Sequence, residues 1–295
     1  MHRNHVLLAA CAIGALASPP SLTAQAPPGT DIYLVSVRTT GGQVRFGDAK
    51  NVTDRPGYDN QPSFLPDGSA LLYTSNRGDQ TDIYRYDIAA STTRQVTATS
   101  PESEYSPAVT PAGNTFSVVR VEADSTQRLW QFTLDGLNPA IVLADVMPVG
   151  YFAWGDEHRV VLFVLGSPST LQVADARTGE ARIVAYNVGR SIHKIPGRHA
   201  VSFTHREAGF WIKELDLDTQ AVTPLVELRD SEYYAWMPDG SILTGQESKL
   251  LRWHPAQNPA WQEAADFAAA GITGISRLAV SPRGDWLAIV GAREQ

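Results

Sequence analysis

The 295-residue chain contains one cysteine, Cys11, and has no second long apolar run after the one near its start. A single cysteine excludes an intramolecular disulfide, so packing has to stabilise the fold. The sequence also lacks a G-x-S-x-G elbow, an H-E-x-x-H pair and a glycine-rich phosphate loop. These absences exclude the most readily recognised serine-hydrolase, zinc-protease and nucleotide-binding sites.

Basic residues are outnumbered, with 24 Lys and Arg against 31 Asp and Glu, for a formal net charge of −7. If a leader containing Arg3 is removed, −7 loses one positive charge and becomes −8. A protein of this charge is not expected to bind nucleic acid or anionic lipid. We therefore expect neither a nucleic-acid partner nor membrane insertion.

The first residues have the three parts of a secretory signal peptide: a short basic start, an apolar run over residues 6–17, and small residues with prolines. The run is too short to span a bilayer. We expect cleavage after Ala24, with Ala26 as the alternative, and a periplasmic or secreted protein. Cys11 ends a lipoprotein-like "LAAC", but only about five apolar residues precede it, so a lipid anchor is not expected.

A P-x-G turn flanked by alternating apolar residues recurs along the chain, as in "FLPDGSALLYT" and "VSPRGDWLAIV". Two weaker copies of this turn, at Gly155 and Gly197, complete the series. The six turn glycines are Gly68, Gly113, Gly155, Gly197, Gly240 and Gly284, at successive steps of 45, 42, 42, 43 and 44 residues. Each turn predicts a two-stranded hairpin, and a second strand pair follows it. Four short strands per period predict an all-β, six-bladed β-propeller.

The two ends of this pattern are complementary. The chain begins with a trailing strand pair, "DIYLVSVRTT" and "AKNVTD", and its last leading hairpin has no trailing pair after it. We therefore predict that residues 31–54 pair with residues 274–291 in one sheet, so that N-terminal strands complete the last blade. A β-sandwich with regular hairpins is the alternative, but it does not explain the half-repeats. The segment "WQEAADFAAAG" fits either an outer strand or a short helix.

The stretch "YDNQPSFLPDGSALLYTSNRGDQTDIYRYDIAASTTRQVT" closely resembles the repeat of TolB-type propellers, a WD-like "PDG" repeat family. It also resembles the propellers of dipeptidyl and acylaminoacyl peptidases. The resemblance implies a propeller with an exported, scaffold-like role. TolB carries an additional α/β domain and the peptidases a hydrolase domain. Here we expect a signal peptide over residues 1–24, a linker over 25–30 and a single propeller over 31–295.

Acidic residues precede several of the innermost strands, where propellers present side chains to the mouth of the axial channel. Counting back nine from the turn glycine gives Asp59 and Glu104, and counting back eight from Gly240 gives Glu232, with Asp230 beside it. We predict that these four carboxylates converge on one rim and bind a basic segment of a partner or a hard cation. The competing interpretation is that they are solvated loop residues of an acidic protein.

The expected function is a non-catalytic binding scaffold, without a cofactor, that acts as a monomer and recognises an envelope protein or peptide. The alternative is a propeller lyase or lactone hydrolase that uses axial acidic and histidine residues with a divalent metal such as Ca²⁺ or Mn²⁺. The one local histidine group is His193, His199 and His205. Because they fall on two strands they need not converge, so a metal site is not expected there.

Overall fold

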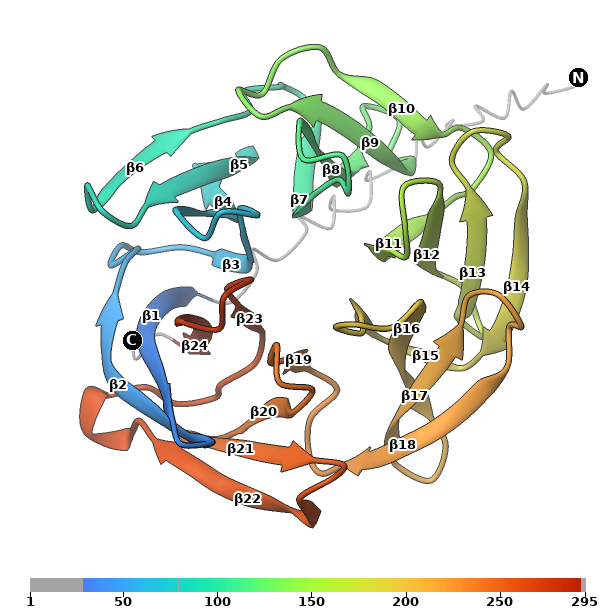
Figure 1. Ribbon diagram of the computed structural model, residues 1–295. Coiled ribbons are helices and arrows are strands. Elements are labelled where there is room, and N and C mark those ends of the chain that lie inside the picture. Colours follow the sequence, from blue (N-terminus) through green and yellow to red (C-terminus); the bar gives the residue numbers. More distant parts are fainter. Residues whose placement is uncertain (1–28, 79, 293–295) are drawn as a thin grey trace, which may run out of the picture.

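The computed structural model describes residues 29–78 and 80–292, which form six four-stranded antiparallel sheets set around a common axis (Figure 1). The predicted signal peptide lies outside the described residues. Each sheet runs from an innermost strand to an outermost strand, as in a propeller blade. No helix in the described part of the chain is long and apolar enough to cross a membrane.

The first three blades follow one another along the chain. Blade 1 consists of β3 (Asp59–Phe64), β4 (Ala70–Arg77), β5 (Gln80–Asp87) and β6 (Thr92–Gln95). Blade 2 consists of β7 (Ser103–Val109), β8 (Thr115–Val121), β9 (Gln127–Thr133) and β10 (Ala140–Leu143). Blade 3 consists of β11 (Val149–Trp154), β12 (Arg159–Val164), β13 (Thr170–Asp175) and β14 (Ala181–Tyr186).

Blades 4 and 5 repeat this order, and blade 6 is composite. Blade 4 consists of β15 (Val188–Lys194), β16 (Ala200–Arg206), β17 (Phe210–Asp216) and β18 (Val222–Leu228). Blade 5 consists of β19 (Tyr234–Trp236), β20 (Ile242–Gln246), β21 (Lys249–His254) and β22 (Asn258–Asp266). Blade 6 consists of β23 (Leu278–Val280), β24 (Trp286–Ala292), β1 (Thr30–Thr40) and β2 (Gln43–Asn51).

The predicted ring closure is confirmed. Strand β1 pairs antiparallel with β24, in a register that runs from Thr30 opposite Ala292 to Ser36 opposite Trp286. The strand order β2-β1-β24-β23 therefore joins strands from the two ends of the chain in one blade (Figure 1). This pairing gives β24 a hydrogen-bonded neighbour on both sides, so that it is not an open sheet edge.

The predicted turns lie between the two innermost strands of their blades. Gly68 and Gly284 have φ of +72° and +70°, in the left-handed region where glycine is favoured. The segment that was ambiguous between strand and helix contains both: β22 forms the outer strand, and Ala268–Ala270 form a short 3₁₀ turn.

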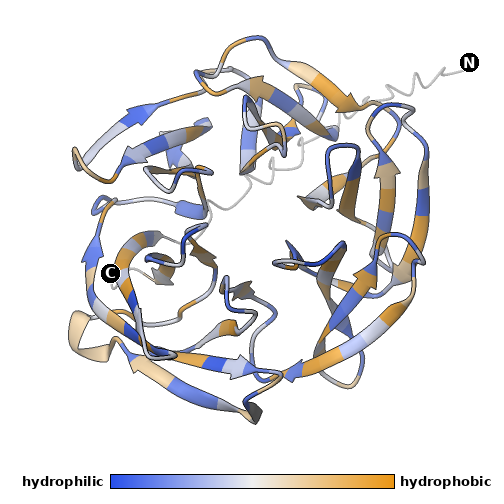
Figure 2. Cartoon of the chain, in the orientation of Figure 1, coloured by the Kyte–Doolittle hydropathy of each residue, from blue (hydrophilic) through white to orange (hydrophobic). Residues whose placement is uncertain are grey.

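The hydrophobic core is divided among the six interfaces between neighbouring blades. In one interface, Ile32 and Leu34 of blade 6 pack against Leu71 and Tyr73 of blade 1, and Ile32 and Leu71 are fully buried. Five similar clusters fill the other interfaces. Figure 2 shows the corresponding alternation of hydrophobic and hydrophilic residues along many strands. Each blade is thus stabilised mainly by its neighbours.

We predict that a protein beginning at residue 41, which lacks β1, unfolds without a single cooperative transition or aggregates. Removing β1 exposes the edge of β24 and the apolar surfaces of blades 1 and 5. A protein that begins at residue 29 is the matched control. Calorimetry and light scattering compare the two, and equal melting of both proteins would show that closure contributes little to stability.

Candidate functional site at the channel mouth

The innermost strands of blades 1 to 4 contain register shifts near their first residues. In blades 1 and 2 the shifted segments contain Gln61 and Ser106, which have positive φ angles of 56° and 54°. Such bulges redirect a side chain relative to regular strand alternation. The Ser106 amide donates a hydrogen bond of 2.8 Å to Gln61 Oε1, which ties the two blades together at the channel.

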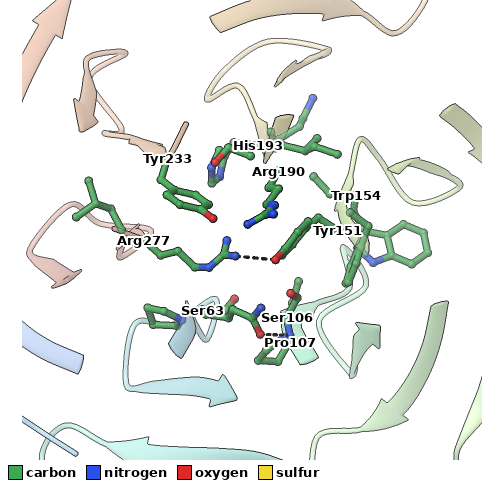
Figure 3. A pocket seen from close by; sticks show the side chains of 18 of the residues that line it. Ser63, Ser106, Pro107, Tyr151, Trp154, Arg190, His193, Tyr233 and Arg277 are labelled. Carbon is green, nitrogen blue, oxygen red and sulfur yellow. Dashed lines mark hydrogen bonds between the residues drawn. The ribbon is translucent and has the colours of Figure 1, made fainter. Parts of the chain in front are cut away.

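The channel mouth holds a cavity of about 300 Å³ (Figure 3). Every blade contributes at least one polar side chain to its wall, and the six that we compare, one from each blade in order, are Gln61, Ser106, Tyr151, Arg190, Tyr233 and Arg277. Trp154 and His193 line it as well. The site is therefore assembled by the whole ring and does not exist in any single blade.

Arg277 and two tyrosines form the most distinctive contact in the cavity. The Arg277 guanidinium lies between the rings of Tyr151 and Tyr233, 4.7 Å and 4.4 Å from their centroids (Figure 3). Its Nη2 donates a 2.8 Å hydrogen bond to the Tyr151 hydroxyl. Cation–π contacts of this kind contribute about 0.5 to 2 kcal/mol each and hold the guanidinium plane in place.

The charge at the cavity wall is positive. Its lining includes Arg190, Lys194 and Arg277, and no aspartate or glutamate. His193 adds no charge, because burial and the nearby Arg277 lower its pKa to about 4. The His193 ring packs edge-on to Tyr234, with 4.7 Å between centroids. A net acidic protein thus has a cationic cavity at its centre.

Two of the carboxylates predicted for the rim are buried inside the wall. Asp59 is 0% exposed and accepts a 2.9 Å hydrogen bond from Arg55. Glu104 is also 0% exposed, and its Oε1 lies 3.3 Å from Arg120 Nε and accepts a hydrogen bond from the Thr99 hydroxyl. In the structure described here, neither presents a free charge to the channel.

The other two predicted carboxylates lie together beside the mouth. Glu232 lies between two arginines, 3.6 Å from Arg190 and 3.2 Å from Arg206, and Asp230 accepts a 3.1 Å hydrogen bond from Gln246. Asp230 and Glu232 line a separate hollow of about 380 Å³ between blades 4, 5 and 6. The four carboxylates therefore do not share one cavity. Their role in binding a partner stays a prediction.

One spacing in the sequence does find the cavity residues. Five of the six polar side chains stand seven positions before their turn glycine, as Arg277 does before Gly284. The four rim carboxylates were instead predicted by counting nine or eight positions back from the turn glycine. In blade 3 the cavity residue Tyr151 stands only four before Gly155, since the turn there is built differently.

The three histidines of the local group make separate contacts. His193 lines the cavity, whereas His199 lies 2.8 Å from Asp218 and 3.1 Å from Asp156, and His205 lies 3.2 Å from Glu207. No group of three or more His, Cys, Asp or Glu side chains in the described part of the chain is arranged to hold a metal ion.

No protein-family model matches the sequence, and neither does any curated protein. Solved structures do match. A structure assigned to TolB of Agrobacterium tumefaciens superimposes with a TM-score of 0.67 and 15% identity, over 91% of this chain and 100% of that chain. TolB from Acinetobacter baumannii gives a TM-score of 0.59 and 14% identity, over 90% of this chain and 64% of that chain.

The fold is a TolB-like six-bladed propeller. A solved structure of an enzyme also matches this chain: an oligogalacturonate lyase in complex with manganese gives a TM-score of 0.56 and 14% identity, over 83% of this chain and 80% of that chain. Identities this low establish the shared fold and leave the activity to be argued from the site.

The buried carboxyl of Glu104 should make the stability of the protein depend on pH. Burial raises its pKa from 4.5 to about 7, against the opposing effects of Thr99 and Arg120. The native state therefore holds a proton that the unfolded state releases between pH 4.5 and pH 7. The resulting stabilisation is complete below pH 4.5 and is lost as pH rises through about 7. Between pH 5 and pH 8 we expect a loss of about 2 to 3 kcal/mol from this group.

This prediction is checked by measuring the free energy of unfolding of wild type and of Glu104→Gln at about pH 5 and at about pH 8. Burial also raises the pKa of Asp59 and of Asp82, so only the difference between the two proteins isolates Glu104. Glu180→Gln, at an exposed turn residue, is the control. An equal pH dependence in wild type and Glu104→Gln would contradict the raised pKa.

Proposed function

We propose that this protein is an exported, non-catalytic binding scaffold that recognises a segment of a protein or peptide partner at the channel mouth. One observation carries the proposal: each of the six blades places at least one polar side chain around a single cavity. Tyrosine and arginine occupy four of the six compared positions, and both are among the residue types enriched at interface hot spots.

The construction of the wall favours binding without rearrangement. The cavity side chains stand on or next to the innermost strands, and several are already held by hydrogen bonds or ring contacts, as Gln61 and Arg277 are. A preorganised site loses little conformational entropy when a ligand binds. The ring closure supports this rigidity, because it prevents the blades from separating.

The dimensions of the site indicate how a partner would bind. A cavity of about 300 Å³ accepts a short segment of chain, and the remainder of a protein partner would contact the surrounding rim. We keep Asp230 and Glu232 as proposed rim contacts, because they lie beside the mouth. Asp59 and Glu104 would act on binding through the wall, by holding Arg55 and Arg120.

Export is proposed from the sequence of residues 1–24. The TolB-like fold is consistent with an envelope location, and an envelope protein or peptide is the partner we propose. The scaffold is proposed to act as a monomer.

A catalytic role has one observation in its favour. His193 lies in the cavity with a pKa of about 4, so its imidazole is neutral near pH 7 and can act there only as a weak general base. A lyase or lactone hydrolase of the propeller type would add a divalent metal. Thermal-shift measurements with Mn²⁺ and Ca²⁺, together with elemental analysis, distinguish the two functions: a metal-dependent rise in melting temperature favours the enzyme.

We predict that Ser63→Trp reduces partner capture from the native envelope fraction at least tenfold. Ser63 lines the channel wall on β3, and an indole at this position fills space that a bound segment needs (Figure 3). Thr92→Trp, on the exposed outer strand of the same blade, is the matched control. Both variants should melt like wild type. Undiminished capture by Ser63→Trp would move the binding site away from the channel.

A further inference from the structure

Arg277 indicates the chemistry of the ligand that the cavity accepts. No carboxylate among the described residues forms an ion pair with this arginine, whose recorded contacts are the two tyrosine rings and the Tyr151 hydroxyl. Arginine remains charged at all physiological pH values. A guanidinium partly removed from water and without a counter-charge is stabilised by an anion in the cavity.

The neighbouring charges add to this effect. Arg190 and Arg206 share the single carboxylate of Glu232, so these three groups carry a net charge of +1, from two positive and one negative. Arg277 and Lys194 each add a further positive charge to the cavity wall. Burial, and after it the charge of Arg277, lower the pKa of His193, so this residue adds no charge of its own near pH 7. An anionic group entering the mouth relieves this repulsion.

The position of the guanidinium selects among anions. Tyr233 lies against the guanidinium and the Tyr151 hydroxyl accepts a hydrogen bond from its Nη2, so a ligand meets an edge that carries the remaining N–H groups (Figure 3). Two parallel N–H donors at such an edge match the two coplanar oxygens of a carboxylate. A tetrahedral phosphate also accepts two bonds, but its other oxygens need further donors above and below the plane of the guanidinium.

We infer that Arg277, with Arg190 as the second cation, binds a carboxylate carried by the partner segment that enters the channel. The carboxylate is an acidic side chain or the terminal carboxylate of the segment. This inference rests on the proposed function for the identity of the ligand as a peptide, and it adds the sign and shape of the group that is recognised.

The test uses three pentapeptide probes in isothermal titration with the full propeller. The first probe is blocked at both ends and has a central glutamate. The second is the same peptide with glutamine in place of this glutamate. The third is pentaglycine that is blocked only at its amino terminus, so that its terminal carboxylate is free. We expect at least one carboxylate probe to bind roughly ten- to a hundredfold more tightly than the glutamine probe, as for a charge-assisted hydrogen-bond pair. The carboxylate probe that binds more tightly shows whether the carboxylate comes from a side chain or from the end of the segment.

Variants assign the effect to Arg277. Arg277→Gln should abolish the preference for carboxylate, and Arg277→Lys should retain part of it, because an ammonium keeps the charge but not the planar pair of donors. Arg177→Gln, in an exposed turn where the arginine pairs with Asp175, is the control and should bind like wild type. If Arg277→Gln does not fold, Arg277→Lys and Arg190→Gln carry the comparison.

Three results would overturn the inference: binding of both carboxylate probes no tighter than that of the glutamine probe, an unchanged preference in Arg277→Gln, or displacement of the bound carboxylate probe by inorganic phosphate at lower concentration than by acetate. Failure of the proposed function is seen separately. If Ser63→Trp blocks partner capture and Arg277→Gln does not, the scaffold stands and the carboxylate site falls. If Ser63→Trp leaves capture unchanged, the scaffold site falls, whatever the titrations show.

Discussion

The antiparallel pairing of β1 with β24 is the interaction on which the rest of this structure depends. A propeller blade buries its faces against its two neighbours, so a ring that does not close leaves two apolar faces in water. Here the strand from the start of the described chain fills the third place in the sixth blade, and its Ile32 and Val35 face the blades on either side. Hydrogen bonding and hydrophobic burial at one joint therefore hold all six blades at fixed positions.

Closure also determines the channel. With six blades fixed, the innermost strands converge on one axis, and short irregularities in them decide which side chains face it. Gln61 and Ser106 show how: a positive φ within a bulge places each of them in the cavity, while Asp59 and Glu104, two residues earlier, are buried in the blades. The energetic cost of these backbone conformations is borne by the surrounding sheet.

The distribution of charge also differs between the interior of the blades and the channel. Buried carboxylates pair with arginines, as Asp59 does with Arg55 and Glu104 with Arg120, and a charge buried without such a partner would be costly. Arg277 is an exception, since its neighbours are aromatic. A chain of net charge −7 thus has a cationic centre, and the overall charge gives the wrong sign for the potential that a ligand in the channel experiences.

The sequence by itself determined the blade count, the turn positions and the closure, because these follow from a period of 42 to 45 residues and from complementary half-repeats at the ends. It also predicted a site just before the innermost strands, whereas four of the six polar cavity side chains lie on these strands. Only the tertiary structure decided which of these residues face the channel. A register shift of one residue moves a side chain to the other face of a strand, and the apolar pattern does not record it. The partners of Arg277 lie 44 and 126 positions away along the chain, so their contacts arise only when the ring has closed.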